Sequence, residues 1–159
     1  MSRMLLRAPG FVHLHVHSSF SLLEGALRID DLKKQALKDR MPALALTDTN
    51  NLFGALEFSE KMTGAGIQPI AGIELSVDWE EERSPTRMAS VQEVRPTLVL
   101  LACNEAGYAQ LMKLASKAYL EAPHGEGPHV VIRDLLGDTD GLICLTGGAK
   151  GPVDRALAQ

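Results

Sequence analysis

The sequence has few cysteines and no long apolar run, and each shortage excludes a class of protein. Its two cysteines, Cys103 and Cys144, stand apart and cannot form the disulfide framework of a small secreted domain. We expect both thiols to be free, to pack as small apolar groups and to lie in a reducing compartment, the cytoplasm. No apolar stretch approaches the roughly 18 residues that a membrane-spanning helix needs, which argues against a membrane protein.

Basic charge is scarce as well. The 16 lysines and arginines are outnumbered by 20 acidic residues, the net charge is −4, and no basic block stands out. A surface that grips DNA phosphates normally carries clustered lysine and arginine, so we expect this chain to bind DNA poorly by itself. What the sequence does have is 45% hydrophobic residues over a length of 159, which is enough for one globular domain covering residues 1–159.

Short apolar runs alternate with amphipathic stretches along the chain. We predict strands at Phe11–His17, Ala43–Thr47, Ile67–Val77, Leu98–Cys103 and Leu142–Thr146. We predict helices at Ile29–Asp39, Phe53–Thr63 and Glu105–Leu120, and a further helix from Pro152 onward. Because helices of this length separate most of the strands, the pattern predicts an α/β fold with a mostly parallel sheet and outer helices, as an open sheet or part of a barrel.

Three stretches depart from this alternation. Residues 78–95 are charged and aperiodic, which predicts a surface excursion. The segment LTGGAKGP at residues 145–152 places glycines and Lys150 after a strand but lacks the P-loop pattern, so we predict a glycine-built turn. The chain stops inside its last predicted helix, without a capping residue, and we therefore expect it to be part of a longer protein.

Three histidines alternate near the N-terminus. Because side chains at every second position of a strand share a face, His13, His15 and His17 are predicted to project together. Neighbours in this trio would lie roughly 6.6 Å apart along the strand, a span that two imidazoles can bridge with metal–nitrogen bonds of about 2.0–2.1 Å. The outer pair is about twice as far apart, so three working histidines would imply either a multinuclear site or one spectator. The alternative is that these histidines form a polar strand edge or are hydrogen-bonded core residues.

Carboxylate and amide side chains follow the next strands. Asp48 and Asn50 come after the second predicted strand, and Glu74 lies late in the third. Functional groups collect at the carboxyl ends of parallel strands, and a mixed nitrogen and oxygen set suits zinc, manganese or iron. The alternative is that Asp48 and Asn50 cap the helix that begins near Phe53. The serines at positions 18, 19 and 21 are predicted to shape a turn.

Five sequence blocks occur in an order that resembles a known family. They are FVHLHVHSSFSLLEGAL, MPALALTDTNNLFGALEF, GIQPIAGIEL, LVLLACNEAGYAQLMKLASKAY and GLICLTGG. Together they cover most of residues 11–148 and resemble the PHP domain that opens bacterial DNA polymerase III alpha subunits. The resemblance implies a distorted β/α barrel of seven strands with outer helices. This chain would then be a single partial PHP domain that holds about the first five strands.

The resemblance also implies a metal centre. In metal-binding members of the family, an H-x-H pair falls on His15 and His17, and a glutamate falls on Glu74. With Asp48 as a weaker fourth candidate, these residues are expected to hold one weakly bound divalent ion, zinc or manganese.

Other ligand positions of the family are not matched. Two positions that usually hold histidine are Thr49 and Thr97 in this sequence. A final Asp-x-His motif would lie beyond Gln159. We therefore expect the multinuclear centre of the active PHP enzymes to be missing.

Two classes of function follow from the resemblance. The parent alpha subunit is the DNA-directed DNA polymerase of chromosomal replication, which uses magnesium, and its PHP domain either proofreads with its own metals or docks a separate exonuclease. The missing ligands favour a non-catalytic, structural and docking role. The partners would then be the rest of the alpha chain and the proofreading exonuclease, with DNA contacted only through the parent protein. The alternative is a metal-dependent phosphoesterase, 3′–5′ exonuclease or pyrophosphatase, which needs a fuller ligand set.

Overall fold

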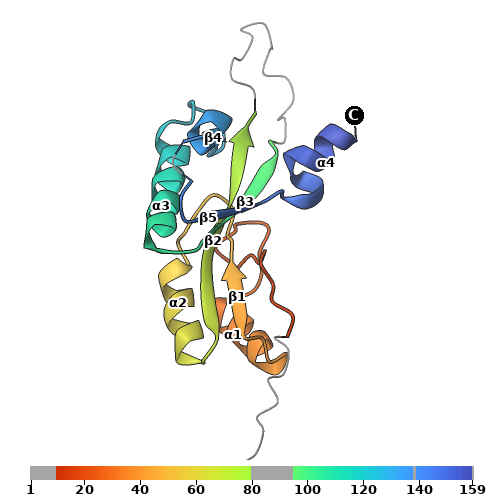
Figure 1. Cartoon of the computed structure of the whole chain (residues 1–159), viewed down its shortest axis with the longest axis vertical. Helices are drawn as coiled ribbons and strands as arrows, with labels where there is room; N and C mark the ends of the chain where they lie inside the picture. The colour runs from red at the N-terminus through yellow and green to blue at the C-terminus, as the bar shows by residue number, and fades with distance from the viewer. Residues whose placement is uncertain (1–9, 80–94, 138, 159) are drawn as a thin grey trace, which may run out of the picture.

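The computed structural model describes residues 10–79, 95–137 and 139–158, and it shows a mixed α/β domain built on a five-stranded sheet (Figure 1). Its elements in chain order are α1 Ile29–Lys38, β1 Ala43–Leu46, α2 Ala55–Gly64, β2 Gln68–Asp78, β3 Thr97–Ala102, α3 Glu105–Leu120, β4 Val130–Val131, η1 Ile132–Leu135, β5 Leu142–Leu145, η2 Gly148–Lys150 and α4 Pro152–Leu157. In the view of Figure 1, α2 and α3 lie along one side of the long strand β2, and α4 lies on the other side.

The helices form where the apolar spacing and the terminal charges predict them. In α1, the buried residues Ile29, Leu32 and Ala36 recur at helical spacing, and Asp30 and Asp31 place negative charge in the first turn. In α3, the side chain of Asn104 caps the first turn by accepting a hydrogen bond from the backbone N–H of Gly107 at 2.9 Å. The predicted helices at these two positions are confirmed to within one residue.

The long strand β2 organises the sheet. Its first half pairs with β1 in parallel, from Ala43↔Gln68 to Leu46↔Ala71, and its last two residues pair with β4 in parallel. Its second half pairs with β3 in the antiparallel direction, and β3 pairs with β5 in the same way. The α/β fold class is confirmed, but the sheet is mixed, and the expectation of a mostly parallel sheet is wrong. The two antiparallel pairings are responsible, and no predicted helix separates β2 from β3 in the sequence.

The two faces of β2 differ in chemistry. Ile73, Leu75 and Val77 are fully buried and belong to the cluster that packs against α3. The side chains between them in sequence, including Glu74, point to the opposite face, because successive residues of a strand alternate. On that opposite face lies a small cluster of Ala45, Val99 and Leu101. A third cluster joins α1, α2 and β1 through residues such as Phe58 and Met62.

Several local expectations are corrected by the structure. Residues 11–17 form no strand. They run extended beside β1 and are joined to it by two backbone hydrogen bonds, Ala45 N–H to the His13 carbonyl and Thr47 N–H to the Val16 carbonyl. Both cysteines are free, as expected, but they are exposed rather than packed as apolar groups. The short strand β4 was not predicted.

The predicted surface excursion at residues 78–95 falls mostly outside the described residues, which stop at position 79 and resume at position 95. Its first residue, Asp78, is the last residue of β2.

No helix in the described ranges is long and apolar enough to cross a membrane.

Candidate metal centre

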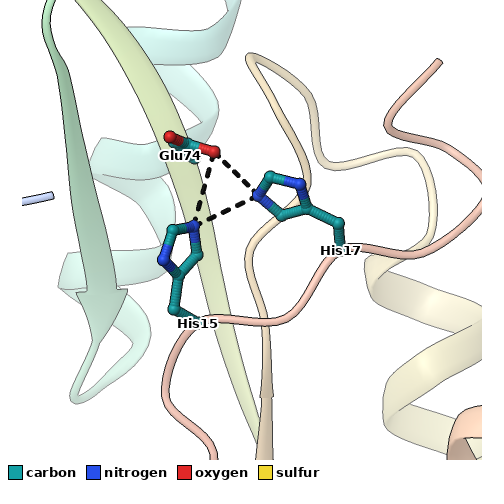
Figure 2. A group of neighbouring side chains, drawn as sticks. All are labelled: His15, His17 and Glu74. Atoms are coloured by element: carbon teal, nitrogen blue, oxygen red, sulfur yellow. Dashed lines mark hydrogen bonds and ion pairs between the residues drawn. The ribbon is translucent and has the colours of Figure 1, made fainter. Parts of the chain in front are cut away.

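Three side chains converge where the N-terminal segment passes β2. His15 and His17 project from the extended segment toward Glu74 on β2 (Figure 2). The two Nε2 atoms of the histidines are 3.2 Å apart, and Glu74 Oε2 lies 3.4 Å from His15 Nε2 and 2.7 Å from His17 Nε2. One ligand atom from each of the three side chains lies within 4.8 Å of the other two. In the part of the chain that the structure describes, this is the group of three or more His, Cys, Asp or Glu residues that meets this distance.

The histidine pair is fixed through the residue between them. Val16 donates its backbone N–H to Thr47 Oγ1 at 3.0 Å, and its carbonyl accepts the N–H of Thr47 at 2.8 Å. These bonds hold residue 16 against the end of β1. Since side chains alternate along an extended segment, His15 and His17 are both directed to the opposite side.

Glu74 is fixed through its backbone. Its N–H donates to the Asp48 carbonyl at 3.1 Å, and its carbonyl accepts the N–H of Asn50 at 2.7 Å. The segment after β1 therefore continues the parallel pairing past Leu46, with a bridge between Thr49 and Glu74. On the other edge of β2, Glu74 is paired with Val99. The glutamate thus sits between β3 and the segment that follows β1, and it is only 1% exposed.

The charges in the triangle stabilise one another. Burial of Glu74 raises its pKa, but hydrogen bonds from His15, His17 and Thr97 outweigh this effect and hold the pKa of Glu74 well below its usual range. The hydrogen bond with Glu74 raises the pKa of His17 above its ordinary value of 6.5, partly opposed by burial. Without an ion, the pair therefore favours an imidazolium beside a carboxylate.

The donor set fits a small divalent cation. Metal–ligand bonds of about 2.0–2.1 Å in tetrahedral geometry separate the ligand atoms by roughly 3.3 Å. Two of the three separations, at 3.2 and 3.4 Å, match this value. The third, 2.7 Å between His17 and Glu74, is a direct ion pair that must widen by about half an ångström to admit an ion. Two imidazoles and one carboxylate leave a fourth position open, as in catalytic zinc sites.

Comparison with known proteins places the chain in a family. The model of the PHP domain matches residues 13–159. This chain belongs to the PHP domain family. The DNA polymerase III subunit alpha of Caulobacter vibrioides is 45% identical over 149 residues, which cover 94% of this chain and 13% of that protein. The error-prone DNA polymerase of Symbiobacterium thermophilum is 41% identical over 164 residues, which cover 94% of this chain and 14% of that protein.

A solved structure supports the fold. An amidohydrolase from Chromobacterium violaceum, determined with bound sulfate and no metal, superposes with a TM-score of 0.50 at 25% identity, covering 67% of this chain and 32% of that chain. The family match and the identity with polymerase relatives confirm the resemblance to the PHP region of DNA polymerase III alpha subunits. The chain spans only about an eighth of the polymerases' length.

Asp48 lies outside the triangle of this PHP domain. Its Oδ1 accepts hydrogen bonds from the Ser18 N–H at 2.7 Å and the Ser21 hydroxyl at 2.6 Å, and its Oδ2 accepts one from the Ser18 hydroxyl at 2.7 Å. With these three bonds the carboxylate ties down the loop that follows His17. The prediction that serines shape this turn is confirmed for positions 18 and 21.

The alternative prediction of helix caps is wrong. Asp48 makes the contacts above, and Asn50 exchanges hydrogen bonds with Ser76 on β2 through Nδ2 at 3.0 Å and Oδ1 at 2.8 Å. The α2 helix instead follows Gly54, without a side-chain cap.

Glu24 is a site residue that sequence reasoning missed. Its Oε2 lies 3.5 Å from His17 Nδ1 and accepts the hydroxyl of Thr49 at 2.7 Å, while its Oε1 lies 3.9 Å from Lys150 Nζ. A carboxylate on the far nitrogen of a metal-binding imidazole is a common way to orient the ring. The signal in the sequence was an acidic residue in the turn directly after the histidines.

The two threonines at family ligand positions both contact carboxylates. Thr49 donates to Glu24, and the hydroxyl of Thr97 donates to Glu74 Oε1 at 2.6 Å. His13 lies apart from the triangle, with its ring in a T-shaped contact with the ring of Phe11. His124 and His129 also lie outside it, and His129 is bonded to the Gly127 carbonyl. His13 is thus the member of the alternating trio that stays outside the group.

Replacing Asp48 is expected to loosen the loop after His17. Asp48→Ala removes three hydrogen bonds to a buried charge, and we expect it to destabilise the fold by roughly 2–4 kcal/mol in chemical denaturation. Asp39→Ala, at an exposed position, is the control and should change stability by less than about 0.5 kcal/mol. Equal effects of the two substitutions would contradict the structural role assigned to Asp48.

The ion pair between His17 and Glu74 predicts a pH dependence of stability in protein freed of metal with a chelator. Because the pKa of His17 is raised, its contribution is complete below the ordinary value of 6.5 and is lost as pH rises through the raised pKa. Because the pKa of Glu74 is lowered, its contribution is present above the ordinary value of 4.5 and is lost only as pH falls through the lowered pKa.

His17→Gln should therefore cost roughly 1–3 kcal/mol at a pH between these two ordinary values and distinctly less at pH about 8.5. Thermal or urea unfolding at both pH values measures the difference. His13→Gln, which alters an exposed histidine outside the triangle, is the control and should change stability by less than about 0.5 kcal/mol. A cost for His17→Gln that is the same at both pH values would refute the ion pair.

Proposed function

We propose that this chain forms the N-terminal PHP part of a replicative DNA polymerase alpha subunit, where it has a structural and docking role and holds a single divalent ion. The identity with polymerase relatives over 94% of the chain supports the parent activity, DNA-directed DNA synthesis with magnesium. The partners are then the remainder of the alpha chain and the proofreading exonuclease subunit, and DNA is reached through the parent protein. The cytoplasm is the corresponding location.

The observation that carries this proposal is that the hydroxyls of Thr49 and Thr97 are engaged in hydrogen bonds to carboxylates. Hydrolysis by a two-metal or three-metal site needs additional ligands around the first ion. Thr49 and Thr97 lie beside the triangle, but their hydroxyls donate to Glu24 and Glu74. A neutral hydroxyl is a much poorer zinc ligand than imidazole. The described part of the site therefore supports one ion.

Zinc or manganese suits the donor set of His15, His17 and Glu74. When bound, such an ion supplies a Lewis acid and an electrostatic link between the N-terminal segment and β2. The residues themselves do the positioning. Val16 holds the histidine pair against β1, and the strand pairing of Glu74 holds its carboxylate opposite them.

A docking surface is supported by the loop after His17. Leu22 is 81% exposed and Leu23 is fully exposed, and Leu23 has a φ of 68°, an unfavourable conformation for a leucine. The loop is held in this shape by the hydrogen bonds to Asp48. An apolar pocket of a partner that covered these two leucines would remove their exposed apolar surface from water, which favours association.

The single-ion proposal predicts a metal content of no more than one ion per chain. Elemental analysis of protein purified without chelator should give at most one zinc or manganese ion, and His15→Ala and Glu74→Ala should each remove it, because two remaining ligands hold zinc poorly. Asp48→Asn should keep the ion, since Asp48 lies outside the triangle. Two or more tightly held ions per chain would contradict the proposal.

The docking proposal predicts a complex with the proofreading exonuclease. On size exclusion the chain should co-elute with that subunit, and the double variant Leu22→Ser, Leu23→Asn should weaken the complex at least tenfold. Asparagine tolerates the positive φ at position 23, so the loop conformation is kept. Leu120→Ser, which alters a leucine with 83% exposure on α3, is the matched control and should bind as the unmodified chain does.

A hydrolysis assay on the same protein distinguishes the docking role from the alternative, a metal-dependent phosphoesterase. Release of nucleotides from a DNA 3′ end, or of phosphate from an ester, by the chain with manganese would favour a metal-dependent phosphoesterase if His15→Ala abolished it. Co-elution with the exonuclease and no hydrolysis would support docking.

A further inference from the structure

Thr97 and Glu74 form a buried pair on the face of the sheet opposite the one that packs against α3. Thr97 is the first residue of β3, and the register pairs it with Ser76 and pairs Glu74 with Val99. Glu74 and Thr97 are therefore diagonal neighbours on the same face of an antiparallel pair. The Thr97 hydroxyl donates to Glu74 Oε1 at 2.6 Å, and Thr97 is only 8% exposed.

This hydrogen bond makes the two oxygens of Glu74 inequivalent. Oε1 is engaged by the hydroxyl, while Oε2 faces Nε2 of both His15 and His17. A carboxylate without such a bond can rotate about its last torsion, which is broad, and can offer both oxygens to an ion. We propose that Thr97 is a positioning residue that fixes Glu74 as a one-oxygen ligand. This inference rests on the single-ion site proposed above.

Thr97 is itself held in place by the loop after β5. Gly147 has a φ of 76°, and a Cβ added there would lie 2.1 Å from the carbonyl oxygen of Thr97. The glycine thus allows the loop to pack directly on the backbone of residue 97. On the preceding side, the Pro96 carbonyl accepts the N–H of Val77 at 2.9 Å. The β-branched threonine side chain is also restricted in its first torsion.

The expected consequence concerns coordination number. Two imidazoles and one carboxylate oxygen give three protein ligands and one open position. Without the hydroxyl, both oxygens of Glu74 would be free to bind an ion, so the coordination number would rise and the orientation that presents Oε2 alone would be lost. Outer-shell hydrogen bonds of this kind typically contribute 10–100-fold to metal affinity.

The test compares three variants of the full 159-residue chain. Thr97→Val keeps the shape and removes the hydroxyl, Thr97→Ser keeps the hydroxyl, and Thr63→Val makes the same chemical change at an exposed position of α2. Zinc affinity is measured by calorimetry. The absorption of bound cobalt(II), which is stronger in four-coordinate sites than in five- or six-coordinate sites, reports the coordination number.

We expect zinc to bind Thr97→Val 10–100-fold more weakly than the unmodified chain, with weaker cobalt absorption per bound ion. Thr97→Ser and Thr63→Val should stay within about threefold of the unmodified chain and keep its spectrum. Unchanged affinity and spectrum in Thr97→Val would overturn the positioning role while leaving the single-ion site intact. A comparable loss in Thr97→Ser would also overturn it, because the hydroxyl would then not be the cause. Failure of the unmodified chain to bind zinc or cobalt would overturn the site and this inference together.

Discussion

A charged carboxylate buried in the middle of β2 is the constraint on which the rest of the site depends. An unpaired carboxylate at 1% exposure would cost several kcal/mol, so Glu74 must have partners on every accessible oxygen. The threonine at the start of β3 engages one oxygen, and the two histidines of the N-terminal segment face the other. The segment that carries the histidines forms no strand of its own, so this pairing adds to the hydrogen bonds that join His13 and Val16 to β1 and Thr47.

The alternation of side chains along β2 lets one strand serve both the core and the site. Its odd-numbered residues from Ile73 to Val77 pack against α3, and the apolar surface that they bury stabilises the strand. Glu74 is then presented on the other face without any irregularity in the backbone. Its position is fixed twice, by the parallel partner on one edge and the antiparallel partner on the other. A site built on a paired central strand is more rigid than one built on loops.

Sequence alone predicted the features that depend on residues close together in the chain. Alternation predicted that His13, His15 and His17 project together, and the family resemblance singled out His15 and His17. Strand position and the resemblance both pointed to Glu74, so the three members of the triangle were all among the predicted candidates. Helices α1 and α3 were also predicted from the spacing of their apolar residues, with the acidic first turn as a further sign for α1. The direction of β3 was not, because strand direction is set by pairing between residues far apart in sequence. The connection 79–96 carries no helical periodicity, and this was the available sign that β3 need not run parallel to β2.

The remaining failures concern polar residues whose role depends on their partner. Asp48 follows a strand, as a ligand or a helix cap would, and only the folded loop shows that Ser18 and Ser21 use its oxygens. Glu24 was missed because its neighbours, Thr49 and Lys150, come from distant parts of the chain. An aspartate or glutamate in a turn has many local uses, so sequence alone does not separate them.

The ion pair that assembles the triangle also limits how tightly it can hold an ion. His17 must be neutral to bind a metal, yet Glu74 raises its pKa, so an entering cation has to displace a proton and widen a 2.7 Å contact. The free energy of metal binding is therefore the difference between the metal-bound site and the protonated ion pair, which is itself favourable. This difference predicts a modest affinity for the ion. A ligand that binds only the folded state still stabilises it, by about 2.7 kcal/mol at a free concentration 100 times its Kd. In the proposed role, the ion and the proton therefore perform the same task of joining the N-terminal segment to β2, which is why a domain with so few ligands can keep its architecture.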